Sequence, residues 1–291
     1  MIPASGVLPI DKPEGPTSHD AVAAVRRALG IRQVGHTGTL DPFASGLLLV
    51  CVGSATRLAE YLVGLPKTYR ATLILGVSTD TDDKTGTPVH HSEAWRDVTP
   101  ERIRAVLADQ VGTVQQIPPA YSAKKVAGKR MYAVARQGGE VERTPATVTI
   151  HGIEVLRIAP PEVEFEVTCS KGTYIRAIAR DVGEALGVGA HLAALRRTDV
   201  GSWSVDGALH LETLSDAQAV ARAWISPANA VSHLPILEVD SSHLNTLAQG
   251  GRIPAAAEIP ENTPVALRSG EALLAIGERI GAEVQPRKVL A

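Results

Sequence analysis

One carboxylate, Asp41, stands between a glycine-rich loop and an apolar strand in the stretch "VGHTGTLDPFASGLLLVCVG". Pro42 follows it, and a residue before proline is held in extended backbone, away from helix. An anchored carboxylate at the edge of a core has the chemistry of a nucleophile or a general base. The same residue could instead be a turn aspartate that caps its own loop. What lies opposite Asp41 decides between the two.

Arg176 occupies an unfavourable place for a cation. In "CSKGTYIRAIARDVG" we predict a helix with Thr173 as its cap, which puts Arg176 in the first turn. A cation there opposes the helix dipole at a cost of up to about 1 kcal/mol, which an anionic partner would offset. If that partner is Asp41, the guanidinium lowers the pKa of the carboxyl and keeps it ionised. A solvated arginine is the alternative.

Tyrosine is scarce in this chain, whose aromatic content is only 3%. Tyr69 and Tyr174 are therefore noted as candidates. A tyrosine beside a catalytic carboxylate offers a flat face on which a nucleic-acid base can stack. Core packing explains either ring equally well when each is taken alone.

The segment "GVSTDTDDKTG" invites a calcium interpretation through Asp80, Asp82 and Asp83. An EF-hand loop needs glutamate at its twelfth position, where His91 stands, so we predict a turn with capping aspartates. The chain has no GxxxxGK[ST], HExxH or CxxC motif, and its histidines show no ligand spacing. We therefore expect chemistry that uses neither a metal nor a cofactor.

Composition predicts a cytoplasmic protein with a sizeable core. The chain has 291 residues, 44% of them hydrophobic. Its longest apolar run, Leu47–Val52, is far shorter than the roughly 20 residues that a membrane span needs. No basic-then-apolar leader is seen, and Cys51 and Cys169 are predicted to be reduced thiols in the core.

The net charge of -2 means that contact with a polyanion would have to come from a local patch. Such a patch lies within residues 121–143, where basic residues occur in succession without an acidic one between them: Lys124, Lys125, Lys129, Arg130 and Arg136. The alternative is a solvated surface segment.

Periodicity and capping residues predict several helices. One lies in "PTSHDAVAAVRRALG", with Ser18 as its cap and Gly30 beyond its end, and another follows Thr99. A third ends at Gly187, and "AHLAALRR", residues 190–197, is predicted to form a shorter one.

Strands are expected at 46–53, 67–76, 146–158 and 162–170. Together with the helices they make a mixed α/β core. From about Ser232 onward the chain changes to short strands separated by glycine and proline, so we place a domain boundary there.

Five stretches, taken in order, resemble the successive motifs of the TruB-type tRNA pseudouridine synthases: "GVLPIDKPEGPTSHDA", "GHTGTLDPFASGLLLV", "PPAYSAKKVAGKRMYAVARQG", "CSKGTYIRAIARDVG" and "AHLAALRRT". The resemblance covers roughly residues 5 to 230. It implies a pseudouridine synthase fold, of mixed α/β (α+β) class, with a largely antiparallel central sheet. Residues 1–231 would form this catalytic domain, with 121–143 as a basic RNA-gripping insertion, and 232–291 a small β-rich PUA-like module.

The resemblance also implies roles for single residues. Asp41 matches the catalytic aspartate, Arg176 the arginine that pairs with it, and Tyr69 the tyrosine that packs on the target base. The positions expected to bind the substrate or support its loop are His36, Tyr174, Leu195, Lys12 and Pro13, together with Lys124, Lys125, Lys129 and Arg130. Of these, His36 would push into the T-loop as the nucleotide leaves the stack.

The implied activity is the conversion of uridine to pseudouridine at position 55, in the T-loop of tRNA. Attack on C1′, addition at C6 and a glycal route all remain open for Asp41. We expect a monomer that binds the T-arm of tRNA, with no cofactor, membrane or obligate protein partner. The alternatives are a synthase acting on rRNA or with a guide RNA, and a non-catalytic tRNA-binding or chaperone protein.

Overall fold

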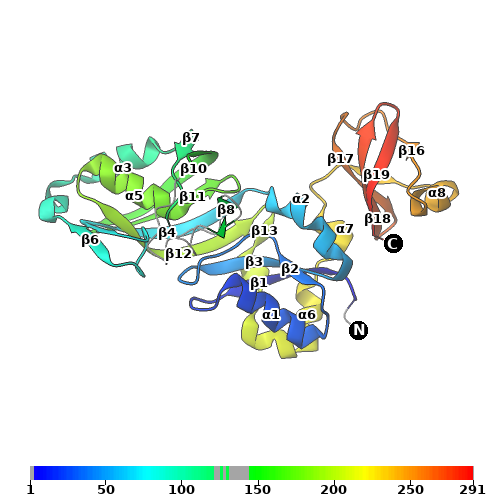
Figure 1. Cartoon of the computed structure of the whole chain (residues 1–291), viewed down its shortest axis with the longest axis horizontal. Helices are drawn as coiled ribbons and strands as arrows, with labels where there is room; N and C mark the ends of the chain where they lie inside the picture. The colour runs from blue at the N-terminus through cyan, green and yellow to red at the C-terminus, as the bar shows by residue number, and fades with distance from the viewer. Residues whose placement is uncertain (1–2, 121–124, 127–128, 131–143, 291) are drawn as a thin grey trace.

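The computed structural model describes residues 3–120, 125–126, 129–130 and 144–290 (Figure 1). Lys124 and most of the predicted insertion 121–143 therefore lie outside the described residues. Inside them, short strands β8 (Lys125–Val126) and β9 (Lys129–Arg130) pair antiparallel.

A ten-stranded sheet forms the centre of the molecule, in the order β14-β1-β3-β12-β4-β11-β10-β7, with β13 on β12 and β2 on β3. Its strands are β1 (Gly6–Lys12), β2 (Val34–His36), β3 (Ser45–Val52), β4 (Lys67–Leu75), β7 (Gly112–Gln116), β10 (Ala146–Ala159), β11 (Glu162–Cys169), β12 (Ala190–Val200), β13 (Trp203–Ser204) and β14 (Leu209–His210). Only the pairs β1–β14 and β3–β12 are parallel. The mixed α/β class and the largely antiparallel sheet are confirmed.

A narrow seam joins the two halves of this sheet. β3 and β12 pair through Ser45 with Arg196 and Gly46 with Arg197 only. Gly46 has φ +107°, and a Cβ there would lie 2.2 Å from the carbonyl oxygen of Arg197. Only glycine fits where these two strands meet, because any side chain would push them apart.

Helices cover the sheet: α1 (Ser18–Leu29), α2 (Ala59–Val63), α3 (Pro100–Ala108), α5 (Ile175–Leu186), α6 (Ala217–Ala223) and α7 (Pro227–Ala230). α3 and α5 pack near β4, β10 and β11, whereas α1 and α6 pack near β1 (Figure 1). Short 3₁₀ helices lie at Gly53–Leu58, Glu93–Asp97, Val205–Gly207 and Leu211–Ser215, and β5 (Val77–Thr79) pairs with β6 (Pro88–His91).

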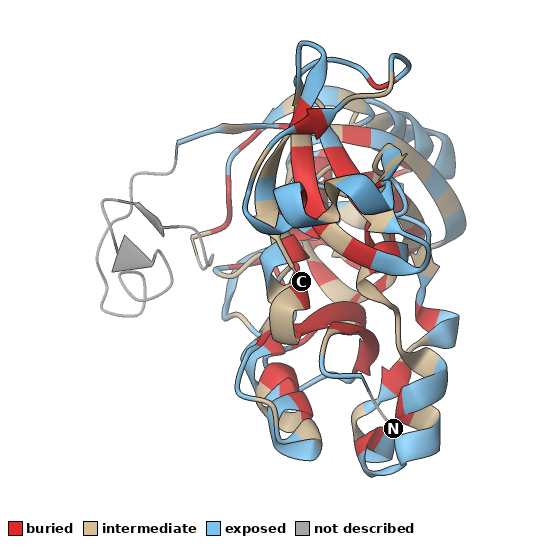
Figure 2. Cartoon of the chain, turned by 90° about the vertical axis from the view of Figure 1, so that its right-hand side faces the viewer, coloured by how far each residue is buried: buried red, intermediate tan, exposed pale blue. Residues whose placement is uncertain are grey.

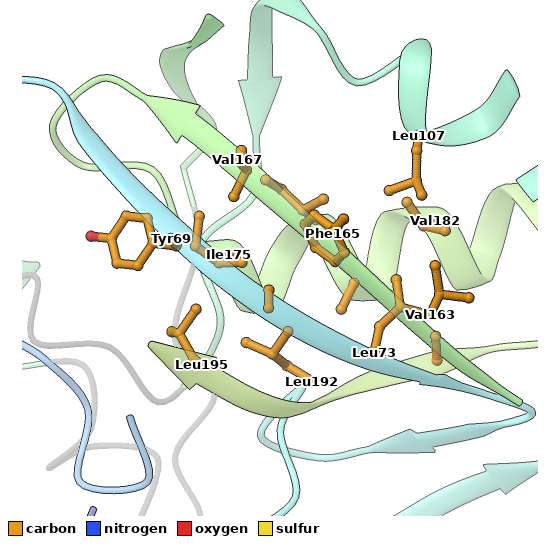
Figure 3. Packing of buried hydrophobic residues seen from close by; sticks show 14 of the residues in the cluster. Tyr69, Leu73, Leu107, Val163, Phe165, Val167, Ile175, Val182, Leu192 and Leu195 are labelled. Atoms are coloured by element: carbon orange, nitrogen blue, oxygen red, sulfur yellow. The ribbon is translucent and has the colours of Figure 1, made fainter. Parts of the chain in front are cut away.

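The core follows the strands. Figure 2 shows buried residues concentrated along the sheet and exposed ones on the outer faces of the helices. Figure 3 shows Phe165 of β11 packed among side chains from β4, β12, α3 and α5. Cys51 and Cys169 are free and buried in strands, as predicted. No helix in the described part of the chain is long and apolar enough to cross a membrane.

The prediction of a helix at 190–197 is wrong. These residues begin strand β12, which pairs antiparallel with β4 from Ala190–Leu75 to Val200–Lys67. Alanine, leucine and arginine favour helix, but the propensity is weak compared with two neighbouring strands and the burial of Leu192 and Leu195.

Two predicted caps are also wrong. The cap of α1 is Thr17, whose hydroxyl accepts from the backbone N–H of Asp20, while the Asp20 carboxylate accepts from the backbone of Thr17. α5 begins after Tyr174 with no side-chain cap, because the Thr173 hydroxyl donates to the carbonyl of Ser170 instead. The predicted ends of both helices, at glycines in the left-handed conformation, are confirmed.

The last part of the chain forms a second sheet of five strands, in the order β15-β17-β18-β19-β16 (Figure 1). Its elements are β15 (Ile236–Glu238), a 3₁₀ helix at Ser241–His243, α8 (Leu244–Ala248), β16 (Ile253–Pro254), β17 (Pro264–Ser269), β18 (Ala272–Ile280) and β19 (Glu283–Val289). It has its own apolar cluster, and Lys288 donates to the carbonyl of Arg57 at 2.7 Å. The β-rich C-terminal part is confirmed, and a domain boundary near Ser232 stays a proposal.

Candidate active site

A pocket of about 250 Å³ lies where the loop before β3 meets the start of β4, the N-terminus of α5 and the middle of β12. The residues that line it include Thr37, Gly38, Leu40, Asp41, Lys67, Tyr69, Lys171, Tyr174, Arg176, Leu195 and Arg197. Four segments far apart in the sequence therefore place the predicted catalytic residues in one cavity, which has the volume of a nucleoside-sized ligand.

Asp41 and Arg176 meet in this pocket. The distance from Arg176 Nε to Asp41 Oδ2 is 3.0 Å, and the Arg176 side chain is 4% exposed against 36% for Asp41. The pairing expected from the helix dipole is present. The guanidinium is held behind the carboxylate, which keeps one side open to the pocket.

Arg176 has a second carboxylate, which the sequence prediction missed. Its Nη1 lies 3.2 Å from Asp83 Oδ2 and donates to the carbonyl of Thr81 at 2.8 Å. Asp83 is buried, and its Oδ1 accepts from Thr81 Oγ1 and from the backbone and hydroxyl of Thr85. Asp83 thus holds the guanidinium from outside the pocket, while Asp41 pairs with it inside the pocket.

Arg176 acts on the pKa of Asp41 in the expected direction, but the pKa is not lowered overall. Removal of water around the carboxyl raises its pKa above the ordinary value, and the charge of Asp83 adds to this effect. Arg176, and more weakly Lys12, oppose it. The pair with Arg176 therefore limits the desolvation effect without reversing it. The effect of Arg176 on the pKa of Asp41 could be predicted from the sequence. The effects of Asp83 and of desolvation in the pocket could not, because they depend on the fold.

The loop that carries Asp41 is held on both sides by the first residue of α1 and by the segment just before it. The Ser18 hydroxyl accepts from the backbone N–H of Leu40 at 2.8 Å and donates to its carbonyl at 3.1 Å. The backbone N–H of Gly15 donates to the carbonyl of Pro42 at 2.8 Å. The residues immediately before and after Asp41 are thus both fixed, and Ser18 does this in place of capping its helix.

Lys12 supports this segment from inside. Its ammonium donates to the carbonyls of Pro13 and Pro16, at 2.7 and 2.9 Å, and the residue is 0% exposed. Burial lowers the pKa of Lys12 to about 8, although the Asp41 charge opposes this. Lys12 is thus in a position to support the loop, but a direct contact with RNA is not open to it here. Pro13 is exposed.

Tyr69, Leu195 and Tyr174 all line the pocket. Figure 3 shows the Tyr69 ring at the edge of the core, with its hydroxyl pointing away from the packed side chains. Burial raises the pKa of that hydroxyl. The backbone of Tyr174 is held by Gln116, whose side-chain amide accepts from its N–H at 2.7 Å and donates to its carbonyl at 3.0 Å.

His36 lies at the end of β2, next to the pocket residue Thr37. Its ring meets that of His19 edge to face, with centroids 5.4 Å apart, and its Nδ1 accepts from the backbone of Gly38. Burial lowers the pKa of His36 to about 4, so the ring is neutral near pH 7. No group of three His, Cys, Asp or Glu that could hold a metal ion occurs in the described part of the chain.

Comparison with known proteins shows which family this chain belongs to. The TruB family pseudouridylate synthase N-terminal domain matches residues 26–175, and the tRNA pseudouridylate synthase B C-terminal domain matches residues 176–232. A tRNA pseudouridine synthase B of Arthrobacter sp. (strain FB24) is 43% identical over 300 residues, covering 99% of this chain and 97% of the relative. The chain belongs to the TruB family of pseudouridylate synthases.

Other relatives agree. The tRNA pseudouridine synthase B of Ralstonia nicotianae (strain ATCC BAA-1114 / GMI1000) is 42% identical over 296 residues, covering 98% of this chain and 94% of the relative. Among solved structures, a chain of a Cbf5-Nop10-Gar1 complex has a TM-score of 0.78 at 30% identity, covering 98% of this chain and 85% of that one. The TruB family is thus supported by both sequence and fold.

The TruB family motifs explain why the prediction found Asp41 and Arg176 but not Asp83 or Gln116. The first two lie in long motifs of unusual composition, whereas Asp83 lies in a loop with ordinary turn residues and Gln116 at the end of a short strand. One signal was available: "TDTDDKTG" holds more carboxylates than a turn needs for capping.

Proposed function

We propose that this chain converts uridine to pseudouridine at position 55, in the T-loop of tRNA, with Asp41 as the attacking group. The observation that carries the proposal is the Asp41–Arg176 pair in a nucleoside-sized pocket beside Tyr69. Membership of the TruB family makes the enzyme class pseudouridylate synthase. The tRNA substrate is supported by the names of the relatives.

The substrate base has to leave its helix to reach Asp41. Neither its bond to the ribose nor its C5 is accessible while it is stacked, so the nucleotide is flipped at a cost of a few kcal/mol. Tyr69 is placed to stack on the extruded uracil, and Tyr174 and Leu195 to contact it. A neutral His36 can enter the vacated space without bringing a desolvated charge with it.

The reaction moves one bond and one proton. The bond from N1 to C1′ breaks, the bond from C5 to C1′ forms, and the proton that leaves C5 is matched by one taken up at N1. Asp41 acts as nucleophile or base, by attack at C1′, addition at C6 or a glycal route. Arg176 keeps the carboxylate aimed, and Leu195 with the apolar wall limits attack by water on the detached base.

We also propose that the chain works alone, as a cytoplasmic monomer that grips the T-arm through the insertion 121–143. The relatives' names favour tRNA over a guide-dependent target. We propose residues 1–231 as the catalytic domain and 232–291 as a PUA-like module. The match to the C-terminal family domain, which ends at residue 232, supports this division.

The test is incubation of the purified protein alone with unmodified tRNA transcript, followed by mapping of pseudouridine. We expect one modified position, residue 55, and none in a matched transcript with cytidine there. Parallel reactions with rRNA fragments distinguish the alternative substrate. Modification of rRNA alone, or tRNA binding without any turnover, would contradict the proposal.

A further inference from the structure

Gln116 is a buried amide outside the pocket. It ends strand β7, is 3% exposed, and is not one of the residues that line the cavity around Asp41. Burying an amide costs free energy unless its polar atoms are hydrogen-bonded. Both polar atoms bond the same residue: Oε1 accepts from the Tyr174 N–H at 2.7 Å, and Nε2 donates to the Tyr174 carbonyl at 3.0 Å. The whole amide is thus spent on one stretch of backbone.

Tyr174 is the residue at which α5 begins. The start of a helix leaves backbone N–H groups without partners, and a capping box satisfies one of them with an acidic or amide side chain three residues after the cap. α1 uses Asp20 in this way. In α5 the equivalent position is Ala177, which has no polar side chain, and Tyr174 makes no side-chain cap. Gln116 supplies the missing bond from a neighbouring strand.

The end of β7 is itself held in place. The backbone of Gln116 pairs in register with Ala146 of β10. The next carbonyl, that of Ile117, accepts from Arg180 Nη2 at 3.0 Å, and Arg180 lies about one turn of α5 beyond Arg176. α5 is therefore bonded to the end of β7 at its start and again about a turn later, so its first turn has a fixed place relative to the sheet.

We propose that Gln116 is a positioning residue for the isomerisation, because its amide fixes the start of α5 and thereby aims Arg176 at Asp41. Arg176 is the second residue of α5 and follows Tyr174 by two, so a shift of the Tyr174 backbone moves two pocket residues together. The inference rests on the proposed function, since it assigns Gln116 a part in that reaction. A misplacement of about 1 Å can lower a rate by about 100-fold.

The test measures single-turnover rates on an unmodified T-arm hairpin, with the full-length enzyme in excess, for wild type and Gln116→Ala. We expect the rate constant at saturation to fall by about 10-fold or more, because the guanidinium is no longer aimed. The enzyme concentration at half-saturation should change by less than about threefold, because Gln116 does not line the pocket. A loss confined to affinity would overturn the positioning role.

Gln115→Ala is the matched control. Gln115 is the preceding residue of β7, and its exposed amide donates to Thr147 Oγ1 at 2.8 Å. This variant removes the same side chain from the same strand without touching α5. We expect its rate to stay within about twofold of wild type, as for most surface substitutions. Equal rates for Gln116→Ala and Gln115→Ala would overturn the proposal.

Gln116→Glu keeps the shape of the side chain and serves as a second variant that does not leave a cavity. A carboxylate accepts from the Tyr174 N–H but cannot donate to the Tyr174 carbonyl, whereas the protonated acid can do both. Burial raises the pKa of a carboxyl, so the rate relative to wild type should be reduced at about pH 8 and recover toward about pH 5.5. A ratio that stays constant over this range would overturn the role of the two bonds.

A double-mutant cycle with Arg176→Lys tests the route. Gln116→Ala should cost less than about threefold in the Arg176→Lys background, because the alignment that Gln116 maintains is already lost there. Additive losses would overturn the proposal and leave the proposed function intact. No turnover of unmodified RNA by wild type would overturn the proposed function and this inference with it.

Discussion

The two sheets of this chain differ in whether they bury polar and charged side chains. The buried polar and charged residues of the described chain all lie between Asp11 and Arg197, and they include Lys12, Lys67 and Arg176. The five-stranded C-terminal sheet contains none. Burying such groups costs free energy unless they are paired, so their concentration around one pocket indicates a functional requirement there.

The C-terminal sheet keeps its charges outside and paired. Arg252 lies beside Glu283, and Arg287 beside Glu278, in exposed ion pairs. Residues 232–291 carry seven acidic and five basic side chains, so this part holds the whole net charge of -2, and the charges of residues 1–231 balance. The comparison suggests that the second sheet contributes shape and stability, and little attraction for phosphate.

Asp41→Asn should have the largest effect. We expect tRNA binding to survive and turnover to fall by about 10⁴-fold or more, as for the loss of a nucleophile. Release of tritium from 5-labelled uridine measures it. Retained release would remove Asp41 from the reaction.

The same variant should not be less stable than wild type near neutral pH. Because the pKa of Asp41 is raised in the fold, its stabilising contribution is present below the pKa of the unfolded chain. That contribution is lost as pH rises through the folded pKa. The Tm of Asp41→Asn should therefore match or exceed that of wild type at pH 8, with the difference vanishing in acid. A lower Tm at pH 8 would mean that the pair with Arg176 outweighs desolvation.

Arg176→Lys should have the next largest effect. A single ammonium cannot serve Asp41 and Asp83 at once from the same position, so the carboxylate loses its fixed direction. We expect kcat to fall by about 10²-fold, the scale of a misplacement near 1 Å. An unchanged rate in single-turnover assays would separate the anchor from catalysis.

Ser18→Ala should lower kcat by about 10-fold with little change in KM. The backbone of Leu40, the residue before Asp41, loses both of its hydrogen bonds to the Ser18 hydroxyl, so Asp41 is held less firmly. Thr17→Ala is the matched control, since it removes the cap of the same helix and costs about 1 kcal/mol of stability. Thr17→Ala should keep kcat at a temperature where both variants are folded. Ser18→Cys, which retains a weak donor and acceptor, should recover part of the rate. Equal kcat for Ser18→Ala and Thr17→Ala would reduce Ser18 to a stability role.

The smallest effects should come from the second sheet. Arg252→Ala and Arg287→Ala are expected to change tRNA affinity by less than about twofold, as for exposed ion pairs.

Lys125→Glu and Arg130→Glu, in the proposed RNA-gripping insertion, should each reduce the slope of log affinity against log salt by about one. Equal slopes for all four variants would break the contrast between the two regions.

Sequence reasoning found the pair at the centre of the site because each member lies in an unusual local setting. Asp41 precedes a proline at the edge of an apolar strand, and Arg176 opposes a helix dipole. It failed where the outcome depends on tertiary neighbours. The local sequence of residues 190–197 predicts a helix, but pairing with β3 and β4 makes residues 190–200 a strand. The local sequence around Asp83 predicts a turn residue, and only the fold shows that Asp83 pairs with Arg176.

The raised pKa of Asp41 belongs to the same class of failure. A cation nearby in the fold can be inferred from a motif, but the loss of water around a carboxyl depends on every segment that closes the pocket. Ser18 shows the local version of this limit. Serine is a common helix cap, and only the fold shows that the Ser18 hydroxyl bonds the backbone of Leu40 in the loop of Asp41 instead.

The two-pair contact between β3 and β12 places the catalytic pair on opposite sides of a joint. Asp41 enters with the strand on one side, while Tyr69, Leu195 and Arg176 belong to strands and a helix on the other. Leu40, Phe43 and Ala44 flank Asp41 and pack in one cluster with residues of the other half-sheet and of α5. A rotation of one half-sheet against the other would therefore disturb this packing together with the spacing of carboxylate and guanidinium. Catalytic alignment in this fold is therefore set by how the Asp41 loop packs against the core of β4, β12 and α5, and Gly46 is the residue that lets β3 and β12 approach each other.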